Sequence, residues 1–129
     1  MEYSLLDRRP EEACLPLLKA HHKGLLVRGA IAQGLLAGKP AKPYLSYSQD
    51  KIAGFIEALK KVDDNNKTIM QLALQYVLQH PVTGSVIAGI RTVEELEQFI
   101  AITELPPLSE RVYEQLQQLI EPLTYQEHR

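Results

Sequence analysis

Two short apolar runs, each followed directly by a glycine and a helical pattern, constrain the fold of this chain most. One run covers Leu25 to Arg28 and ends at Gly29, and the other, SVIAG, ends at Gly89. Continuous, partly β-branched runs of this length are typical of strands buried on both faces of a parallel sheet. The recurring order of strand, glycine and helix predicts βαβ units, and therefore an α/β fold with right-handed crossovers.

Helices are expected around these strands because apolar residues recur at three- and four-residue steps after good capping residues. Thr68 with Gln71 predicts a capping box and a helix, buried around most of its circumference, that runs to Pro81. Thr92 with Glu95 predicts a second box, followed by a helix that buries Leu96, Phe99 and Ile100. Two more helices are expected to begin at Ser48 and near Ser109.

The first 24 residues predict one more strand and one more helix. Tyr3 to Leu6 favours a short strand, and a helical segment follows around Leu15 to His22, with Gly24 as its stop signal. About three parallel strands would leave two bare sheet edges, which soluble proteins avoid. We therefore expect the sheet of this chain to be incomplete by itself.

Composition excludes several functional classes. The 129 residues, 45% hydrophobic, suit one domain over 1–129, and a net charge of −2 without a basic stripe argues against nucleic acid. The single Cys14 cannot form an internal disulfide, and no apolar run approaches the length of a membrane span, so we expect a soluble cytoplasmic protein. No histidine, cysteine or acid has metal-ligand spacing, so no metal site is expected.

The two glycine turns favour anion binding, because glycine after a strand lets backbone N–H groups approach a ligand that faces a helix N-terminus. Arg91 could add a bidentate contact to a phosphate. Gly29 and Gly34 have P-loop spacing, but Lys and Ser or Thr do not follow, and the dinucleotide pattern G-x-G-x-x-G is absent. Plain turn chemistry for the glycines, and ion pairs for Arg28 and Arg91, remain alternatives from the residues alone.

Four segments, in this order and spacing, resemble the C-terminal half of aldo-keto reductases: YSLLDRRPEE, VRGAIAQGLLAGK, QLALQYVLQHP and SVIAGIRTVEELEQ. The resemblance covers nearly the whole chain and is strongest to bacterial NADPH-dependent members. It implies a partial (β/α)8 barrel that consists of the last three βα units and additional helices. It also implies an NADP(H) site at the turns after the seventh and eighth strands.

Carried over by this resemblance, Tyr3 lies near the nicotinamide, and Arg28 replaces a tyrosine that stacks on it. The backbone of Gly29, Ala30, Ile31, Ala32 and Gly34 would follow the pyrophosphate. Gly89, Arg91 and Thr92 would hold the adenosine phosphate, with Glu95 and Gln98 near the adenine. Two departures predict reduced affinity: Gln98-Phe99 stands where the family has Glu-Asn, and Glu95 places a negative charge beside a phosphate.

The catalytic Asp, Tyr, Lys and His of the family belong to the first four strands, and nothing in this sequence matches their motifs. We therefore expect an oxidoreductase fragment with a partial cofactor site, whose NADP(H) binding is weak or absent, and with no catalytic residue of its own. One alternative is a non-catalytic interaction module that forms a homo-oligomer. Another is a carbonyl reductase active only when a complementary N-terminal half-barrel is supplied.

Overall fold

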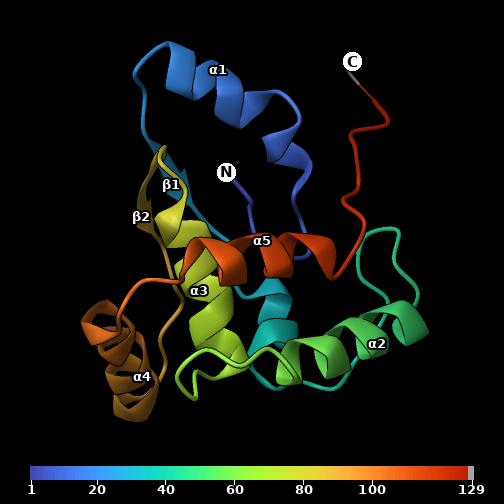
Figure 1. Ribbon diagram of the computed structural model, residues 1–129, viewed down its shortest axis with the longest axis vertical. Coiled ribbons are helices and arrows are strands. Elements are labelled where there is room, and N and C mark those ends of the chain that lie inside the picture. The colour runs from blue at the N-terminus through green and yellow to red at the C-terminus, as the bar shows by residue number, and fades with distance from the viewer. Residues whose placement is uncertain (128–129) are drawn as a thin grey trace.

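The computed structural model describes residues 1–127 and is shown in Figure 1. Its elements in chain order are η1 (Arg9–Glu11), α1 (Cys14–Ala20), β1 (Leu25–Val27), η2 (Ala32–Ala37), α2 (Gln49–Lys60), α3 (Ile69–Gln79), β2 (Thr83–Val86), α4 (Val93–Glu104) and α5 (Glu110–Gln118). None of the helices in this part of the chain has both the length and the apolar character needed to cross a membrane.

The sheet is a parallel pair, with Leu25 opposite Thr83 and Val27 opposite Val86. A third parallel contact joins Glu2 to Arg28 on the other side of β1. The α/β class with parallel strands is therefore confirmed, and a partial barrel is consistent with it. The strand expected from Tyr3 to Leu6 is reduced to the bridge at Glu2.

The chain leaves this bridge early because of Ser4. Its hydroxyl oxygen accepts hydrogen bonds from the backbone N–H groups of Leu6 and Asp7, at 3.2 and 3.0 Å. Such local bonds compete with a strand ladder and favour a turn. The chain then enters η1 and α1, and returns as β1 beside its own first residues.

Most helix starts follow the capping signals. Ser48, Thr68, Thr92 and Ser109 each cap a helix, and both halves of the capping box are present at Thr68 and Gln71. Residues 72–77 of α3 are all buried, as the apolar pattern predicts. This helix packs against β2 and against η2, and so it forms the centre of the core.

One face of the sheet lacks cover, which corrects the expectation of strands buried on both faces. Leu26 in the middle of β1 is 60% exposed, and Ile87, just after β2, is 59% exposed. The alternation of β1 is buried, exposed, buried. In the described part of the chain the helices leave this face to solvent, because the face that lines the inside of a barrel needs further strands to cover it.

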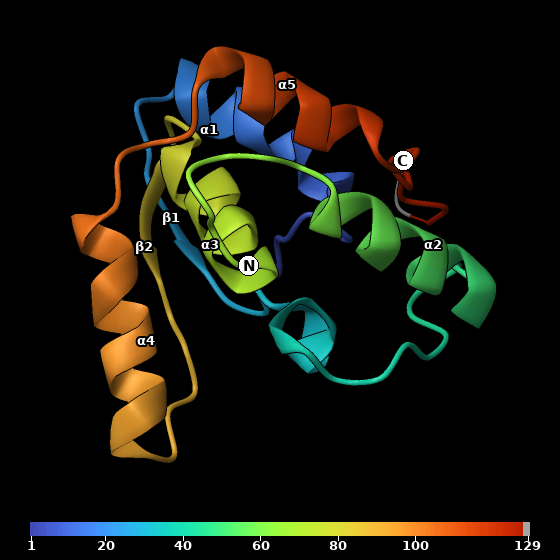
Figure 2. The same cartoon turned by 60° about the horizontal axis from the view of Figure 1, so that its bottom comes forward.

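Helix α4 differs from the expectation in the same way. Leu96 and Ile100 are about half exposed, Phe99 is only partly buried, and Ile102 is the buried residue of this helix. Figure 2 shows α4 standing at the margin of the molecule beside β2. The helix has the apolar stripe that its sequence predicts, but little of the described chain packs against it.

Candidate functional site

A large cavity of about 890 Å³ opens at the carboxyl ends of β1 and β2. Nine of the twelve site residues expected from the sequence line it: Arg28, Gly29, Ala30, Ile31, Gly34, Gly89, Arg91, Glu95 and Gln98. Because β1 and β2 are parallel neighbours, the turns that follow them meet at the same edge. The fold therefore joins two segments that lie about 60 residues apart in the sequence.

The turn after β1 forms one wall of the cavity, and its backbone is unusual. Gly29, Ala32, Gln33, Gly34 and Gly38 all have positive φ angles. Backbone hydrogen bonds from Ala32 to Gly29 (2.8 Å) and from Lys39 to Gly34 (3.1 Å) close the turn on itself. Ala32, Leu35 and Leu36 are buried beneath it, which fixes the wall to the core.

Lys39 reaches back along this wall. A Cβ atom added at Gly34, where φ is +94°, would lie 2.6 Å from Cδ of Lys39. The lysine stem thus lies directly on the glycine backbone, and Lys39 is one of the residues that line the cavity. Only glycine leaves room for this approach while holding that φ angle.

Arg28 and Glu2 form the floor beside the same turn. The Arg28 guanidinium lies 3.4 Å from a Glu2 carboxylate oxygen and is largely exposed. The other Glu2 oxygen accepts a 3.1 Å hydrogen bond from the Tyr44 hydroxyl. Burial, and then the nearby Glu2 charge, raise the pKa of Tyr44, so this phenol is a hydrogen-bond donor at neutral pH.

The opposite wall comes from the start of α4. Glu95 accepts a 2.7 Å hydrogen bond from the backbone N–H of Arg91 and a 3.1 Å bond from its guanidinium. Its backbone N–H donates to the Thr92 hydroxyl, so Thr92 caps the helix. The full capping box expected here is not formed, because the Glu95 carboxylate is held mainly by Arg91.

Three expected residues do not line the cavity. Thr92 serves the helix cap, and Ala32 is wholly buried below the turn. Tyr3 is also wholly buried, and its hydroxyl donates a 2.8 Å bond to Glu11. Because alternate residues beside a strand point to opposite faces, Tyr3 faces the helical layer while Glu2 faces the cavity.

Several lining residues have no role in the sequence-based site, among them Glu2, Lys39, Met70 and Phe99. Lys39 follows Gly38 directly, so its place in the glycine-rich segment was a usable signal. Glu2 could have been found by pairing the first segment with Arg28. Met70 comes from the start of α3, and only the packed structure brings it to this edge.

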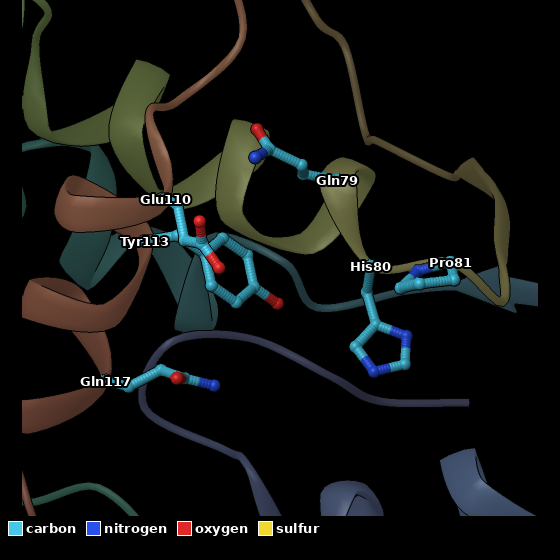
Figure 3. A pocket seen from close by; sticks show the side chains of 6 residues that line it. All are labelled: Gln79, His80, Pro81, Glu110, Tyr113 and Gln117. Carbon is cyan, nitrogen blue, oxygen red and sulfur yellow. The ribbon is translucent and has the colours of Figure 1, made fainter.

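A smaller cavity of about 350 Å³ lies at the other end of α3 (Figure 3). His80 at the end of α3 faces Tyr113 and Gln117 from α5 across it. Its polar groups serve packing: Gln79 bonds both backbone groups of Leu108, and Gln117 donates to the Tyr76 hydroxyl. Burial lowers the pKa of His80, which favours its neutral form. We assign this cavity a structural role.

Nothing in the described residues gathers three or more His, Cys, Asp or Glu side chains at a metal site. Arg28, Lys39 and Arg91 instead supply positive charge around the large cavity, and acidic Glu2 and Glu95 oppose it. Such a cavity suits an elongated ligand with anionic and neutral parts, and its volume is in the usual range for small-molecule sites.

Comparison with known proteins agrees with this geometry. The uncharacterized oxidoreductase YqkF of Bacillus subtilis (strain 168) is 35% identical over 138 aligned positions, which cover 100% of this chain and 44% of that protein. The holo form of the aldo-keto reductase AKR11C1 from Bacillus halodurans superposes with a TM-score of 0.87 at 34% identity, over 100% of this chain and 44% of that one.

A more distant structure shares the fold alone. The glycerol dehydrogenase AKR11B4 from Gluconobacter oxydans has a TM-score of 0.73 at 18% identity, over 96% of this chain and 44% of its own. This chain therefore spans less than half the length of the relatives it matches. The model of the aldo/keto reductase family matches residues 1–121, and the chain belongs to that family.

Proposed function

We propose that this chain forms the NADP(H)-binding portion of an aldo-keto reductase barrel, namely its C-terminal half. The observation that carries the proposal is the single cavity built from both glycine turns, with Arg28, Lys39 and Arg91 around it. Loops after the last strands of such barrels are the usual place for phosphate groups. The positive-φ turn presents backbone close to a ligand, as a pyrophosphate contact requires.

Each group of lining residues would contact a different part of the cofactor. Gly29, Ala30, Ile31 and Gly34 would follow the pyrophosphate by backbone, assisted by the amino group of Lys39. Arg28 would lie flat against the nicotinamide, as a planar guanidinium can. Gly89, Arg91 and Gln98 would lie around the adenosine. When bound, the cofactor supplies the hydride of a carbonyl reduction.

The test is to measure direct binding of NADPH to the 129-residue chain by nicotinamide fluorescence or by calorimetry. Arg28→Ala should weaken binding, because it removes a cavity cation. Arg111→Ala, on the exposed side of α5 and outside the cavity, is the matched control and should bind as the parent does. Absence of any nicotinamide nucleotide binding would overturn the proposal.

We further propose that the chain alone does not reduce carbonyls. Its sequence matches none of the family motifs that carry the Asp, Tyr, Lys and His of catalysis. Hydride transfer without a positioned proton donor loses acid catalysis and stabilisation of the alkoxide. Aldehyde-dependent oxidation of NADPH at 340 nm by pure protein would contradict this.

The uncovered sheet face favours a second candidate function, assembly. Leu26 and Ile87 place apolar surface where a barrel has its interior, and isolated exposed strands readily pair with other chains. The occupant would be a complementary half-barrel, which would restore activity, or a second copy of this chain. Sedimentation velocity of the chain alone, and after mixing with the missing half of a relative such as YqkF, distinguishes the two.

We also place the protein in the cytoplasm, on its single free thiol Cys14. Fractionation of cells that express the tagged chain would test this.

A further inference from the structure

At the end of the cavity beside α4, Glu95 holds Arg91 at two points. One carboxylate oxygen accepts the Arg91 backbone N–H at 2.7 Å, and the other accepts the guanidinium at 3.1 Å. Hydrogen bonds between charged groups are the stronger kind. The backbone N–H of Arg91 and one of its three guanidinium nitrogens therefore already contact a carboxylate of the same chain.

Glu95 remains negatively charged at neutral pH. The backbone hydrogen bond from Arg91, and then the bond from its guanidinium, lower the pKa of this carboxyl. The carboxylate lines the cavity together with Arg91 and Gln98. A phosphate that reached the remaining N–H groups of Arg91 would lie close to this negative charge.

The opposite end of the cavity has a different charge balance. Arg28, Lys39 and Glu2 line it there, and the Arg28–Glu2 contact is a single, longer one of 3.4 Å. The formal charge is therefore +1 at the turn and 0 at α4. Anionic groups of a ligand are drawn to the turn, and the α4 end suits a neutral group.

We propose that Glu95 makes the α4 end of the cavity select a ribose hydroxyl over a ribose phosphate, so that the site prefers NAD(H) to NADP(H). This inference rests on the proposed function and refines its cofactor. A carboxylate accepts hydrogen bonds from neutral hydroxyl groups, and an acidic residue serves the ribose of NAD in other dinucleotide folds. A phosphate carries a charge of about −1.5 to −2 and is repelled by the same group.

The experiment measures dissociation constants of NADH and NADPH separately for the full chain, by calorimetry at low and moderate salt. Glu95→Gln removes the charge but keeps an oxygen that can accept the Arg91 N–H. Glu97→Gln, two residues on and outside the cavity lining, makes the same change in net charge. We expect the parent to bind NADH at least as tightly as NADPH.

Glu95→Gln should tighten NADPH binding roughly five- to tenfold, by removing repulsion across a few ångströms of partly hydrated space, and change NADH binding by less than about twofold. Glu97→Gln should change neither by more than about twofold, and the gain should shrink with salt. An NADPH-to-NADH ratio unaltered by Glu95→Gln would overturn the inference while leaving the proposed function standing. Failure of all variants to bind either nucleotide would overturn both.

Discussion

The chain contains two Arg–Glu pairs of similar sequence spacing in opposite surroundings. Arg8 and Glu11 have side chains that are 9% and 20% exposed, whereas Arg91 and Glu95 are 80% and 31% exposed. In the buried pair, Nε and Nη2 of Arg8 both donate to one Glu11 oxygen, at 3.0 and 2.8 Å. The exposed pair borders the large cavity instead.

The difference shows how burial separates a structural pair from a pair available to a ligand. The other Glu11 oxygen accepts the hydroxyls of Tyr3 and Tyr76, and Arg8 also donates to the Gln117 carbonyl at 2.7 Å. These bonds connect residues 8–11 to α3 and α5. Since a buried charge is costly when left alone, Glu11 should control stability and Glu95 should not.

Glu11→Ala is the strongest test of this contrast. It leaves Arg8 buried without its partner and leaves two tyrosine hydroxyls without an acceptor. We expect the free energy of unfolding to fall by about 3 to 5 kcal/mol, measured by urea denaturation. Glu114→Ala, on the exposed side of α5, should leave the midpoint almost unchanged. Equal midpoints for the two variants would remove the distinction.

The buried pair also predicts a pH dependence. Burial alone would raise the pKa of Glu11, but hydrogen bonds from Arg8 and Tyr76, and the Arg8 charge, outweigh it and lower the pKa below 4.5. A lowered folded pKa means that the stabilisation is present above the ordinary value and is lost as pH falls through the folded one. The thermal unfolding midpoint should therefore decrease as the pH is lowered below about 4.5, and the decrease should be smaller in Glu11→Gln.

Gly34→Ala should have an intermediate effect, because it strains the cavity wall. The positive φ of Gly34 disfavours any Cβ, by about 1 to 2 kcal/mol, and the new methyl group must displace the Lys39 stem. Gly38→Ala is matched for φ, at +95°, but its Cβ would meet no atom within 4 Å. Both should lower stability, and only Gly34→Ala should also weaken nucleotide binding, which titration of the two variants will show.

Arg91→Gln should have the smallest effect on folding. An exposed ion pair between two residues four positions apart contributes little, because solvent screens it. We expect thermal unfolding indistinguishable from that of the parent at moderate salt. A clear loss of stability would mean that the α4 end of the cavity is as structural as the Glu11 cluster, and the comparison would fail.

Local signals made the helices predictable. Ser48, Thr68, Thr92 and Ser109 act as caps through contacts within four residues, so neighbouring residues alone suffice to identify them. The exposure of Leu96 and Ile100 was not predictable, because an apolar stripe shows that a helix has a face to bury and not whether anything covers it. The role of Glu11 was not predictable because it depends on Tyr76, which is 65 residues away.

The sequence alone determined the α/β class, the helix starts and the two glycine turns, since these depend on contacts between residues close along the chain. Only the tertiary structure decided that the turns share one cavity, that Tyr3 turns away from it and that Glu2 and Lys39 enter it. It also decided which Arg–Glu pair is buried. Parallel pairing across about 60 residues sets these outcomes, and no local pattern specifies which strands become neighbours.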